Sequence, residues 1–399
     1  MVTTRSRAYN QHSGVEAETL TDIRRRWSSY LHAQNYHALI LEVLSQELKK
    51  YTNSTVIFPT SLSKIMRECF LILASAPRIF AAAVDGVLTH QFPINQDLQV
   101  EYEQIQERAH VQPSIYIHLL ASPSGIAPTP NQYMTIRSHI LKYLSTAPED
   151  REPAFLIDNI SHPPTSISAI NNGYRKYLHT ATTRRSPRRE ETMLTFCAGI
   201  ERRFSETPPG ERDTPLAHPP GECGYALNSH VRLAQHRKHV SSNYVMNLVS
   251  DICAYLHASG EFQQRFSMHP YIIYLIFRPS QVAIAEMFCS GLLQVYVENG
   301  GGFNYYPAGL STWSKWRVAG EVWREHERYV RATSGLEGNL KRQRERVEGY
   351  ALGLEEGVAE VVREALESGS EEEDGDDGEW VPEDGDGDVE EVTRRLERL

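Results

Sequence analysis

The sequence of 399 residues has few of the features by which common protein classes are recognised. Its five cysteines are an odd number, are widely spread and form no C-x-x-C pair, which argues against a disulfide framework and against a ribbon-type zinc site. We find no Walker loop, no dinucleotide-binding glycine pattern after a strand and no nucleophile-elbow serine, which disfavours the corresponding enzyme classes. The longest apolar stretch, residues 70–88, is interrupted by Pro77, Arg78 and Asp85 and predicts a core helix rather than a membrane span.

Negative charge is concentrated in one short region of the chain. Residues 371–391 contain thirteen acids and no base, and subtracting these acids from the net charge of −10 leaves +3 on the remainder. A mildly basic body can meet an anionic polymer, whereas an acidic tail can compete for the same surface or simply stay solvated. The first 14 residues are positively charged but are followed by no apolar segment. We therefore expect no secretory signal, no membrane partner and an intracellular location in the nucleus or cytoplasm.

The first half of the chain predicts a helical lobe that contains short strands. Residues 1–16 lack apolar periodicity and predict a disordered arm. Apolar residues at helical spacing predict helices over 20–31, 36–51, 61–75 and 77–89. Runs rich in β-branched and aromatic residues predict strands at 113–121 and 154–160, and helices are expected at 131–145 and 166–180.

The region after the basic stretch at 183–191 predicts a small sheet flanked by helices. We expect strands at 192–204, 222–228 and 268–279, and helices at 229–239, 243–259 and from 280 up to the glycines at 300–302. The strand at 268–279 is almost entirely apolar and aromatic, which predicts a central position covered on both faces. The three glycines lack the context of a phosphate-binding loop and predict a turn. The order is therefore β-β-α-α-β-α.

The C-terminal part predicts a charged helix followed by disorder. Residues 311–367 have tryptophans on one face and alternating charges on the others, with an interruption near 333–339. Residues 368–399 contain too little apolar matter to offset the entropy of ordering. The predicted fold class is α+β, with a helical lobe at 17–182, a small mixed or antiparallel sheet with flanking helices at 192–310, a long charged helix and an acidic tail.

One stretch of the sheet region carries a recognisable pattern. Gly224 is followed eight positions later by Arg232, and His236 lies one helical turn beyond that arginine. This segment resembles the part of the GIY-YIG endonuclease superfamily in which a strand ends at a glycine and the next helix carries Arg-Leu-x-x-His. The resemblance covers residues 193–305, with Glu286 and Asn304 where the family has a glutamate and an asparagine. The chain is also similar, in a more general way, to proteins of filamentous fungi.

The resemblance implies a protein that binds nucleic acid and cleaves phosphodiesters. Arg232 would clamp the phosphate through its planar fork of donors, which matches two phosphate oxygens. His236 would orient a phosphate or carry a proton near neutral pH. Glu286 would hold one hard divalent cation, most simply Mg²⁺.

Departures from the family pattern concern its two tyrosines. The position two residues before Gly224, where the family has a tyrosine, is Glu222, which takes the corresponding place in the expected site. The nearby stretch at 192–204 has Glu201 where the other tyrosine is expected, while Tyr116 fits better but lies over 100 residues upstream. Either the hairpin has a very large insertion or the first motif is lost. Weakened or absent activity is expected, because a general base or water-positioning hydroxyl contributes about 10²–10⁴-fold in rate.

Several other interpretations stay open. Arg232 could pair with a neighbouring acid, and Glu286 with a structural arginine. Possible zinc ligands, whose spacing matches no familiar site, are Cys223, His230, His236, His239, Cys253 and His257. In a different class of function, the chain is a catalytically silent interaction protein that binds basic partners such as histones through its acidic tail, or an accessory protein of fungal specialised metabolism.

Overall fold

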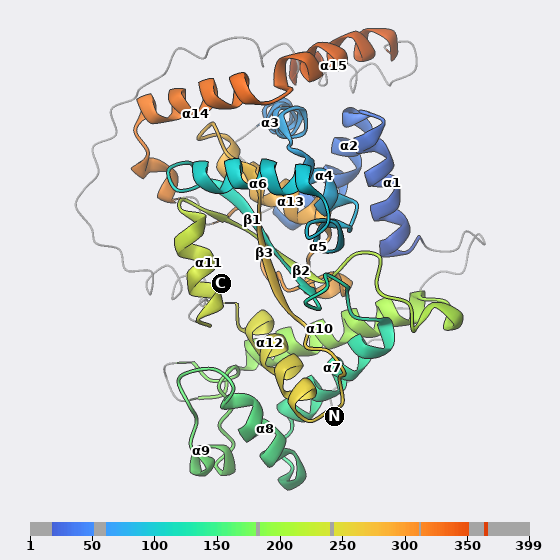
Figure 1. Ribbon diagram of the computed structural model, residues 1–399, viewed down its shortest axis with the longest axis vertical. Coiled ribbons are helices and arrows are strands. Elements are labelled where there is room, and N and C mark those ends of the chain that lie inside the picture. Colours follow the sequence, from blue (N-terminus) through green and yellow to red (C-terminus); the bar gives the residue numbers. More distant parts are fainter. Residues whose placement is uncertain are drawn as a thin grey trace.

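The computed structural model describes residues 18–51, 61–180, 184–239, 243–310, 313–350 and 363–365. They form a small antiparallel sheet surrounded by helices, which confirms the predicted α+β class (Figure 1). The expected arm at 1–16 and acidic tail at 368–399 lie outside the described residues. Among the helices of the described ranges, none combines the length and apolar character needed to cross a bilayer.

The sheet has three strands, with β1 (Ser114–Ala121) in the centre and β2 (Gly221–Ala226) and β3 (Ser267–Leu275) antiparallel on either side. The expected central position of 268–279 was wrong, because β3 is the edge strand of this sheet. Its apolar residues contact α4, α6 and α12 instead of a second neighbouring strand. An apolar run indicates that both faces of a strand are covered, but it does not indicate how many strands lie beside that strand.

The helices before β1 are α1 (Leu20–His32), α2 (Tyr36–Glu47), α3 (Leu62–Ser75), α4 (Arg78–Val84), α5 (Leu88–Gln91) and α6 (Gln96–Arg108). Between β1 and β2 lie α7 (Pro130–Leu144), α8 (Arg151–Asp158), α9 (Ile167–Asn171) and α10 (Pro187–Glu206). The remaining helices are α11 (Ser229–Arg237), α12 (Tyr244–Ala258), α13 (Gln281–Leu293), α14 (Gly320–Thr333) and α15 (Leu336–Tyr350). Short 3₁₀ turns cover Leu48–Tyr51, Pro148–Asp150, Pro209–Glu211, Val297–Asn299 and Trp313–Arg317.

Two stretches expected to be strands are helices. The range 192–204 lies in α10, whose buried residues Met193, Phe196, Cys197 and Ile200 recur at the spacing of one helix face. Ser186 caps this helix by accepting a hydrogen bond from an N–H of its first turn, and Pro187 suits its first position. The β-branched and aromatic composition suggested a strand, but the helical period decides the structure.

The second wrong strand, 154–160, lies mostly in α8, where the buried residues Ala154, Ile157 and Asp158 again follow helical spacing. The helix expected over 166–180 is only the short α9, which ends just before Gly173 at φ 87°. In contrast, the expected interruption near 333–339 is confirmed, because α14 ends at Thr333 and α15 begins at Leu336.

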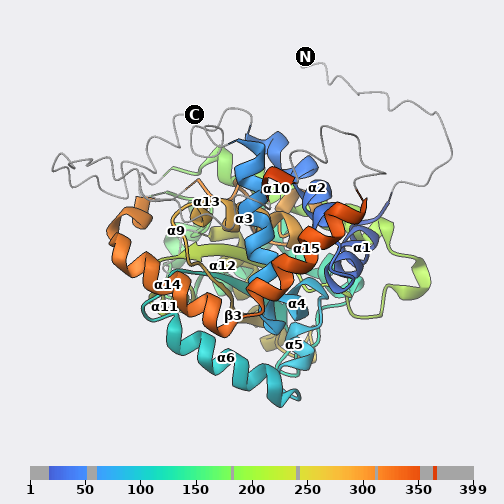
Figure 2. The same cartoon turned by 90° about the horizontal axis from the view of Figure 1, so that it is seen from above.

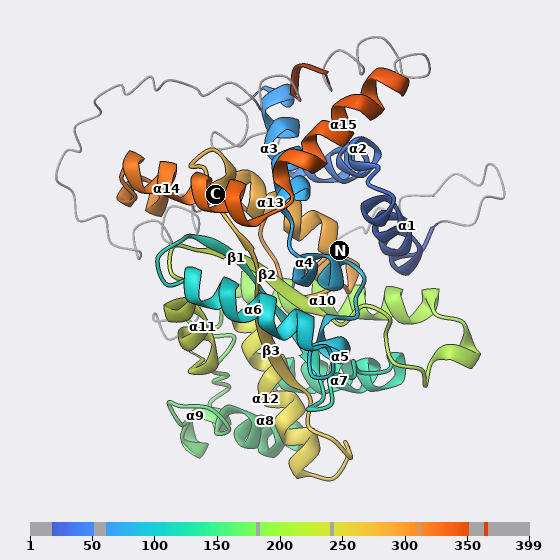
Figure 3. The same ribbon diagram turned by 45° about the horizontal axis from the view of Figure 1, so that its top comes forward.

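Two hydrophobic clusters pack against the sheet. One packs α2, α3, α4 and α13 against residues such as Ile115 and Ile117, while α6 runs across the strands (Figure 3). The other gathers α7, α8, α10 and α12 around Leu120 (Figure 1). Seen from above, α15 crosses over α3, which it contacts (Figure 2). The central strand β1 thus contributes to both clusters.

The glycines at 300–302 form the expected turn, and they also pack tightly against the chain. A Cβ on Gly302 would lie 1.8 Å from the carbonyl oxygen of Gly221, and one on Gly301 would lie 1.9 Å from that of Gln294. The segment therefore crosses the start of β2 with no room for side chains, which only glycine permits.

Candidate functional site

The two neighbouring strands β1 and β2 build the floor of the site. In their register Tyr116 lies opposite Gly224, and His118 lies opposite Glu222. Residues two apart on a strand share a face, so Tyr116 and His118 project to the same side of the sheet as their partners. His118 Nδ1 is 3.0 Å from the Glu222 Oε2 atom. About 100 residues lie between these strands in the sequence, yet they are direct neighbours in space.

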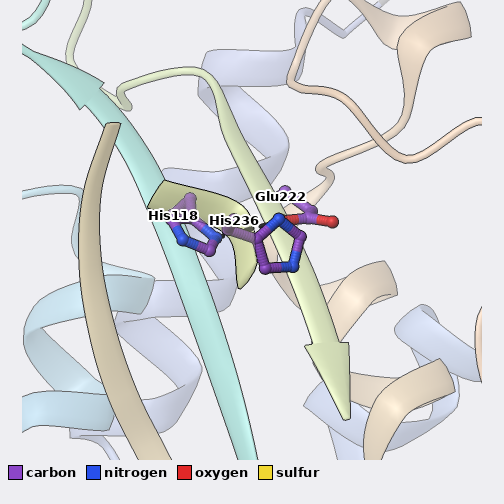
Figure 4. Close-up of side chains that lie close together, drawn as sticks. All are labelled: His118, Glu222 and His236. Atoms are coloured by element: carbon purple, nitrogen blue, oxygen red, sulfur yellow. Dashed lines mark hydrogen bonds and ion pairs between the residues drawn. The ribbon is translucent and has the colours of Figure 1, made fainter. Parts of the chain in front are cut away.

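Helix α11 brings the two remaining members over this face. Arg232 Nε donates a hydrogen bond of 3.3 Å to the hydroxyl of Tyr116, and the same hydroxyl is 3.1 Å from His236 Nε2. The other ring nitrogen of His236, Nδ1, is 3.7 Å from Glu222 Oε2. His118, Glu222 and His236 thus converge from β1, β2 and α11 (Figure 4).

The start of α11 is fixed by two polar contacts. The Asn228 side chain accepts a hydrogen bond from Val231 N–H, which satisfies one free donor of the first turn. The Ser229 hydroxyl lies 2.6 Å from that of Ser114 at the beginning of β1. Because the helix is attached to β1 here, residues one and two turns further along must lie above the strands.

Gly224 is required by the close approach of Tyr116. A Cβ at this position would lie 2.5 Å from the hydroxyl oxygen of Tyr116 and 2.7 Å from its Cζ. Any side chain would push the ring out of its contacts with Arg232 and His236. The glycine therefore has a packing role in the site.

The Glu222 carboxylate is buried but well partnered. Burial by itself would raise its pKa, but hydrogen bonds from His118 and Asn243 and the nearby His236 hold the pKa at about 2. Asn243 donates from Nδ2 to Oε1 at 3.1 Å and also caps α12. Burial lowers the pKa of His236 to about 4, with Glu222 opposing the shift. At neutral pH the site therefore holds an ionised carboxylate beside a neutral imidazole.

Glu286 approaches β2 from α13. Its Oε2 accepts a hydrogen bond of 3.0 Å from Gly309 N–H. Burial raises the pKa of Glu286 to about 7; the backbone N–H groups of Gly309 and Tyr225 oppose this shift, Glu222 adds to it and Arg232 opposes it. Glu286 is therefore close enough to Glu222 and Arg232 for their charges to influence its pKa. No hydrogen bond between Glu286 and either of these side chains is formed among the described residues.

Asn304 has a structural contact with β2. Its Oδ1 accepts from Cys223 N–H at 3.1 Å, and its Nδ2 donates to the Cys223 carbonyl at 2.9 Å. It therefore fastens the 303–305 segment to the strand that carries Glu222. Glu201, at the position where a tyrosine was sought, lies on α10 and pairs with Arg137 at 2.6 Å. The tyrosine beside Arg232 is Tyr116.

His118 was not identified from the sequence. The sequence feature that could have identified His118 is its position two residues after Tyr116 in a predicted strand, because both side chains then lie on one face. Knowing that this strand pairs with 222–228 was also necessary. The contemplated zinc set does not form, since of its members only His236 joins this group: His230 bonds the Gln106 carbonyl at 2.7 Å and His257 that of Phe262 at 3.2 Å.

The group is closed from solvent at its centre. Tyr116, His118, Glu222 and His236 are between 2% and 6% exposed, whereas Arg232 and Glu286 are partly exposed. Two hollows on the surface lie elsewhere, one beside Phe92 and Tyr102 and one beside Pro163 and Pro164. Of these residues, Arg232 and Glu286 are therefore the more accessible to solvent.

Comparison with known proteins adds no relative: no family model, no curated protein and no solved structure matches this chain.

Proposed function

We propose that this site binds a nucleic-acid phosphodiester and cleaves it with low efficiency, as a divergent GIY-YIG-like centre. The observation that carries the proposal is the Tyr116 hydroxyl, which contacts both Arg232 and His236 while lying opposite Gly224. These are the residue types that the family resemblance calls for, arranged on a strand pair and the helix that follows it. The order of β2, α11, α12, β3 and α13 along the chain is consistent with the same resemblance.

In this proposal Arg232 binds the phosphate. Its Nε is engaged with Tyr116, and its Nη1 makes a hydrogen bond of 3.4 Å to the exposed Gln235, which a phosphate oxygen can replace. The guanidinium keeps its charge, because the hydroxyl of Tyr116 and the carboxylates of Glu222 and Glu286 raise its pKa against the effect of burial. A fixed charge next to the phosphate stabilises the extra negative charge of the transition state.

Tyr116 and Glu286 have different roles in the proposal. Burial and Glu222 raise the pKa of Tyr116, so its phenol stays protonated and can donate to a phosphate oxygen or a water. The carboxylate of Glu286 offers the oxygen ligands that suit a cation such as Mg²⁺, which would polarise the phosphodiester when bound. Overall, water adds to phosphorus, one ester P–O bond breaks and the departing oxygen ends as a hydroxyl.

An exposed aromatic residue near Tyr225 of β2 suggests why the substrate is a nucleic acid. Ser314 donates a hydrogen bond of 3.0 Å to the hydroxyl of Tyr225, the residue after Gly224. Two residues further on, Trp316 is 72% exposed, with Lys315 Nζ 5.0 Å from its ring centroid. An exposed indole beside a cation is a suitable surface on which a base can stack.

The experiment is a plasmid-nicking assay in Mg²⁺ or Mn²⁺. We expect nicking by the unaltered protein and none by the double variant Arg232→Ala, Glu286→Ala. Arg237→Ala is the matched control, because Arg237 is an exposed arginine of the same helix. Nicking that the double variant retains, or loss of nicking in the Arg237 variant as well, would reject the assignment of this site.

A silent interaction protein is the second candidate, and the closed centre of the site favours it. With Tyr116 only 2% exposed, the fold can keep this polar group for packing alone. Binding to basic partners would then depend on residues 368–399. Deletion of these residues should abolish the capture of histones in a pull-down, and a deletion without effect would exclude this function.

A further inference from the structure

We propose that His118, Glu222 and His236 bind one divalent transition-metal ion, Zn²⁺ in the first instance. One ligand atom from each residue lies within 4.8 Å of the other two. Two imidazoles and one carboxylate are ligands that Zn²⁺ commonly takes, and three protein ligands leave a fourth tetrahedral position for water. This site differs from the Mg²⁺ expected at Glu286 in its residues and in its nitrogen ligands, and it does not depend on nucleic-acid binding.

The distances between the donor atoms suit a common ion. His118 Nδ1 and His236 Nδ1 are 3.0 Å and 3.7 Å from Glu222 Oε2. Ligands at 2.0–2.2 Å from a tetrahedral zinc are separated from one another by roughly 3.4 Å. The two distances to Glu222 Oε2 are within a few tenths of an ångström of this separation, and the two histidine nitrogens lie within 4.8 Å of each other. The three donors come from β1, β2 and α11, which are already packed together (Figure 4).

His236 carries the atom that a purely hydrogen-bonded arrangement leaves unexplained. Its Nδ1 is buried and has no hydrogen-bond partner among the described residues, although a carboxylate oxygen faces it at 3.7 Å. A protonated Nδ1 at this distance is too far away for a good hydrogen bond, and an unprotonated Nδ1 turns its lone pair toward another lone pair. A cation between the two atoms resolves both difficulties.

The surrounding groups hold the donors in place for such an ion. The Tyr116 hydroxyl is 3.1 Å from His236 Nε2, which leaves Nδ1 directed toward Glu222. Asn243 donates to the other carboxylate oxygen of Glu222 at 3.1 Å and leaves Oε2 for the ion. Metal-binding histidines and carboxylates are commonly oriented by hydrogen bonds of this kind to their second polar atom.

Another histidine–glutamate pair of the molecule provides a contrast. His139 Nε2 lies 3.2 Å from Glu261, so the pair distance resembles that of His118 and Glu222. However, the side chain of Glu261 is 49% exposed. This pair also has no third ligand, since the only such group within the described residues is that of His118, Glu222 and His236. His139 is therefore a matched control for removing a buried histidine.

The first experiment measures metal retention by the untagged full chain. Protein freed of metal with a chelator is loaded with Zn²⁺, passed through a desalting column and analysed by elemental mass spectrometry. We expect one ion per chain for the unaltered protein and for His139→Gln, and essentially none for His118→Gln, Glu222→Gln and His236→Gln. A folded, unaltered chain that retains no Zn²⁺ would overturn the proposal. Retention of Zn²⁺ by the three cluster variants at the level of the unaltered protein would overturn it as well.

The second experiment keeps the test valid if a cluster variant does not fold. X-ray absorption at the zinc edge of the loaded, unaltered protein should show two imidazole ligands together with oxygen. An oxygen-only environment would instead place the ion on carboxylates such as those of 371–391 and would contradict the site. Neither measurement uses nucleic acid, so its failure is distinguishable from a failure of the proposed cleavage.

Discussion

Two polar clusters of this protein differ in the signs of the charges that they bring together. The sheet cluster, Tyr116, His118, Glu222, Arg232 and His236, mixes both signs of charge. The basic cluster contains only cationic or neutral side chains, Arg24, Arg203 and His218, each between 2% and 4% exposed. A buried charge is tolerated only when it is hydrogen-bonded or paired. The two clusters meet this condition with different partners.

In the basic cluster the partners are backbone carbonyls. Arg24 donates to the carbonyls of Ala83 and Val84 at 3.0 and 3.2 Å, near the end of α4. Arg203 donates to the carbonyls of Gly300 and His218 at 3.2 and 2.6 Å. These arginines therefore join segments that are distant in the sequence, and the basic cluster itself includes no carboxylate. In the sheet cluster, by contrast, a carboxylate and two imidazoles face one another.

The largest effect is expected from Arg203→Ala, which should lower the free energy of unfolding by about 2–4 kcal/mol because it leaves two buried carbonyls without donors. Urea unfolding measures this change. The matched control is Arg202→Ala, since Arg202 is an exposed neighbour on α10, and its effect should stay within about 0.5 kcal/mol. Equal effects of the two variants would mean that the basic cluster does not hold these segments together.

A smaller effect is expected from Tyr116→Phe on the sheet cluster. Removing the hydroxyl that orients His236 should weaken Zn²⁺ binding by about 10–100-fold, as measured by competition with a chelating dye. Tyr133→Phe is the control, because the buried hydroxyl of Tyr133 has no hydrogen-bond partner in the part of the chain that the structure describes. If both variants bind Zn²⁺ like the unaltered protein, the hydroxyl of Tyr116 has no part in positioning a ligand.

A third effect concerns the pH dependence of stability at His218. Burial and the charges of Arg24, Arg203 and Arg25 lower the pKa of this histidine far below its ordinary value. Between the folded and unfolded pKa values only the unfolded chain binds the proton. The contribution of His218 to the free energy of unfolding is therefore fully present above about pH 6.5, and it decreases below this pH by about 1.4 kcal/mol per pH unit.

This dependence can be isolated with His218→Gln, which should flatten the stability profile between about pH 5 and 6.5 relative to the unaltered protein. His257→Gln, a change at an exposed histidine, should leave the profile unchanged. A His218 variant with the same slope as the unaltered protein would show that this ring does take up a proton when folded. The positive charges of the basic cluster would then disfavour protonation of His218 less than we infer.

Local sequence signals account for much of the fold. Apolar periodicity and turn residues predicted most helices, the three strands and the break between α14 and α15. The errors came where composition and period disagree, as in α10, whose β-branched and aromatic residues were given more weight than their helical spacing. The spacing of Gly224, Arg232 and His236 was likewise readable, because all three lie within 13 consecutive residues.

Tertiary structure alone decided which distant residues meet. His118 and Glu222 are 104 positions apart, and their pairing depends on β1 choosing β2 as a neighbour and on a register that a shift of one residue would reverse. The sequence by itself determined the α+β class and the local pattern on α11, because periods and caps act over a few residues. Contacts across the sheet arise from burial of the whole core, so the sheet cluster, with its candidate metal ligands, became visible only in the folded chain.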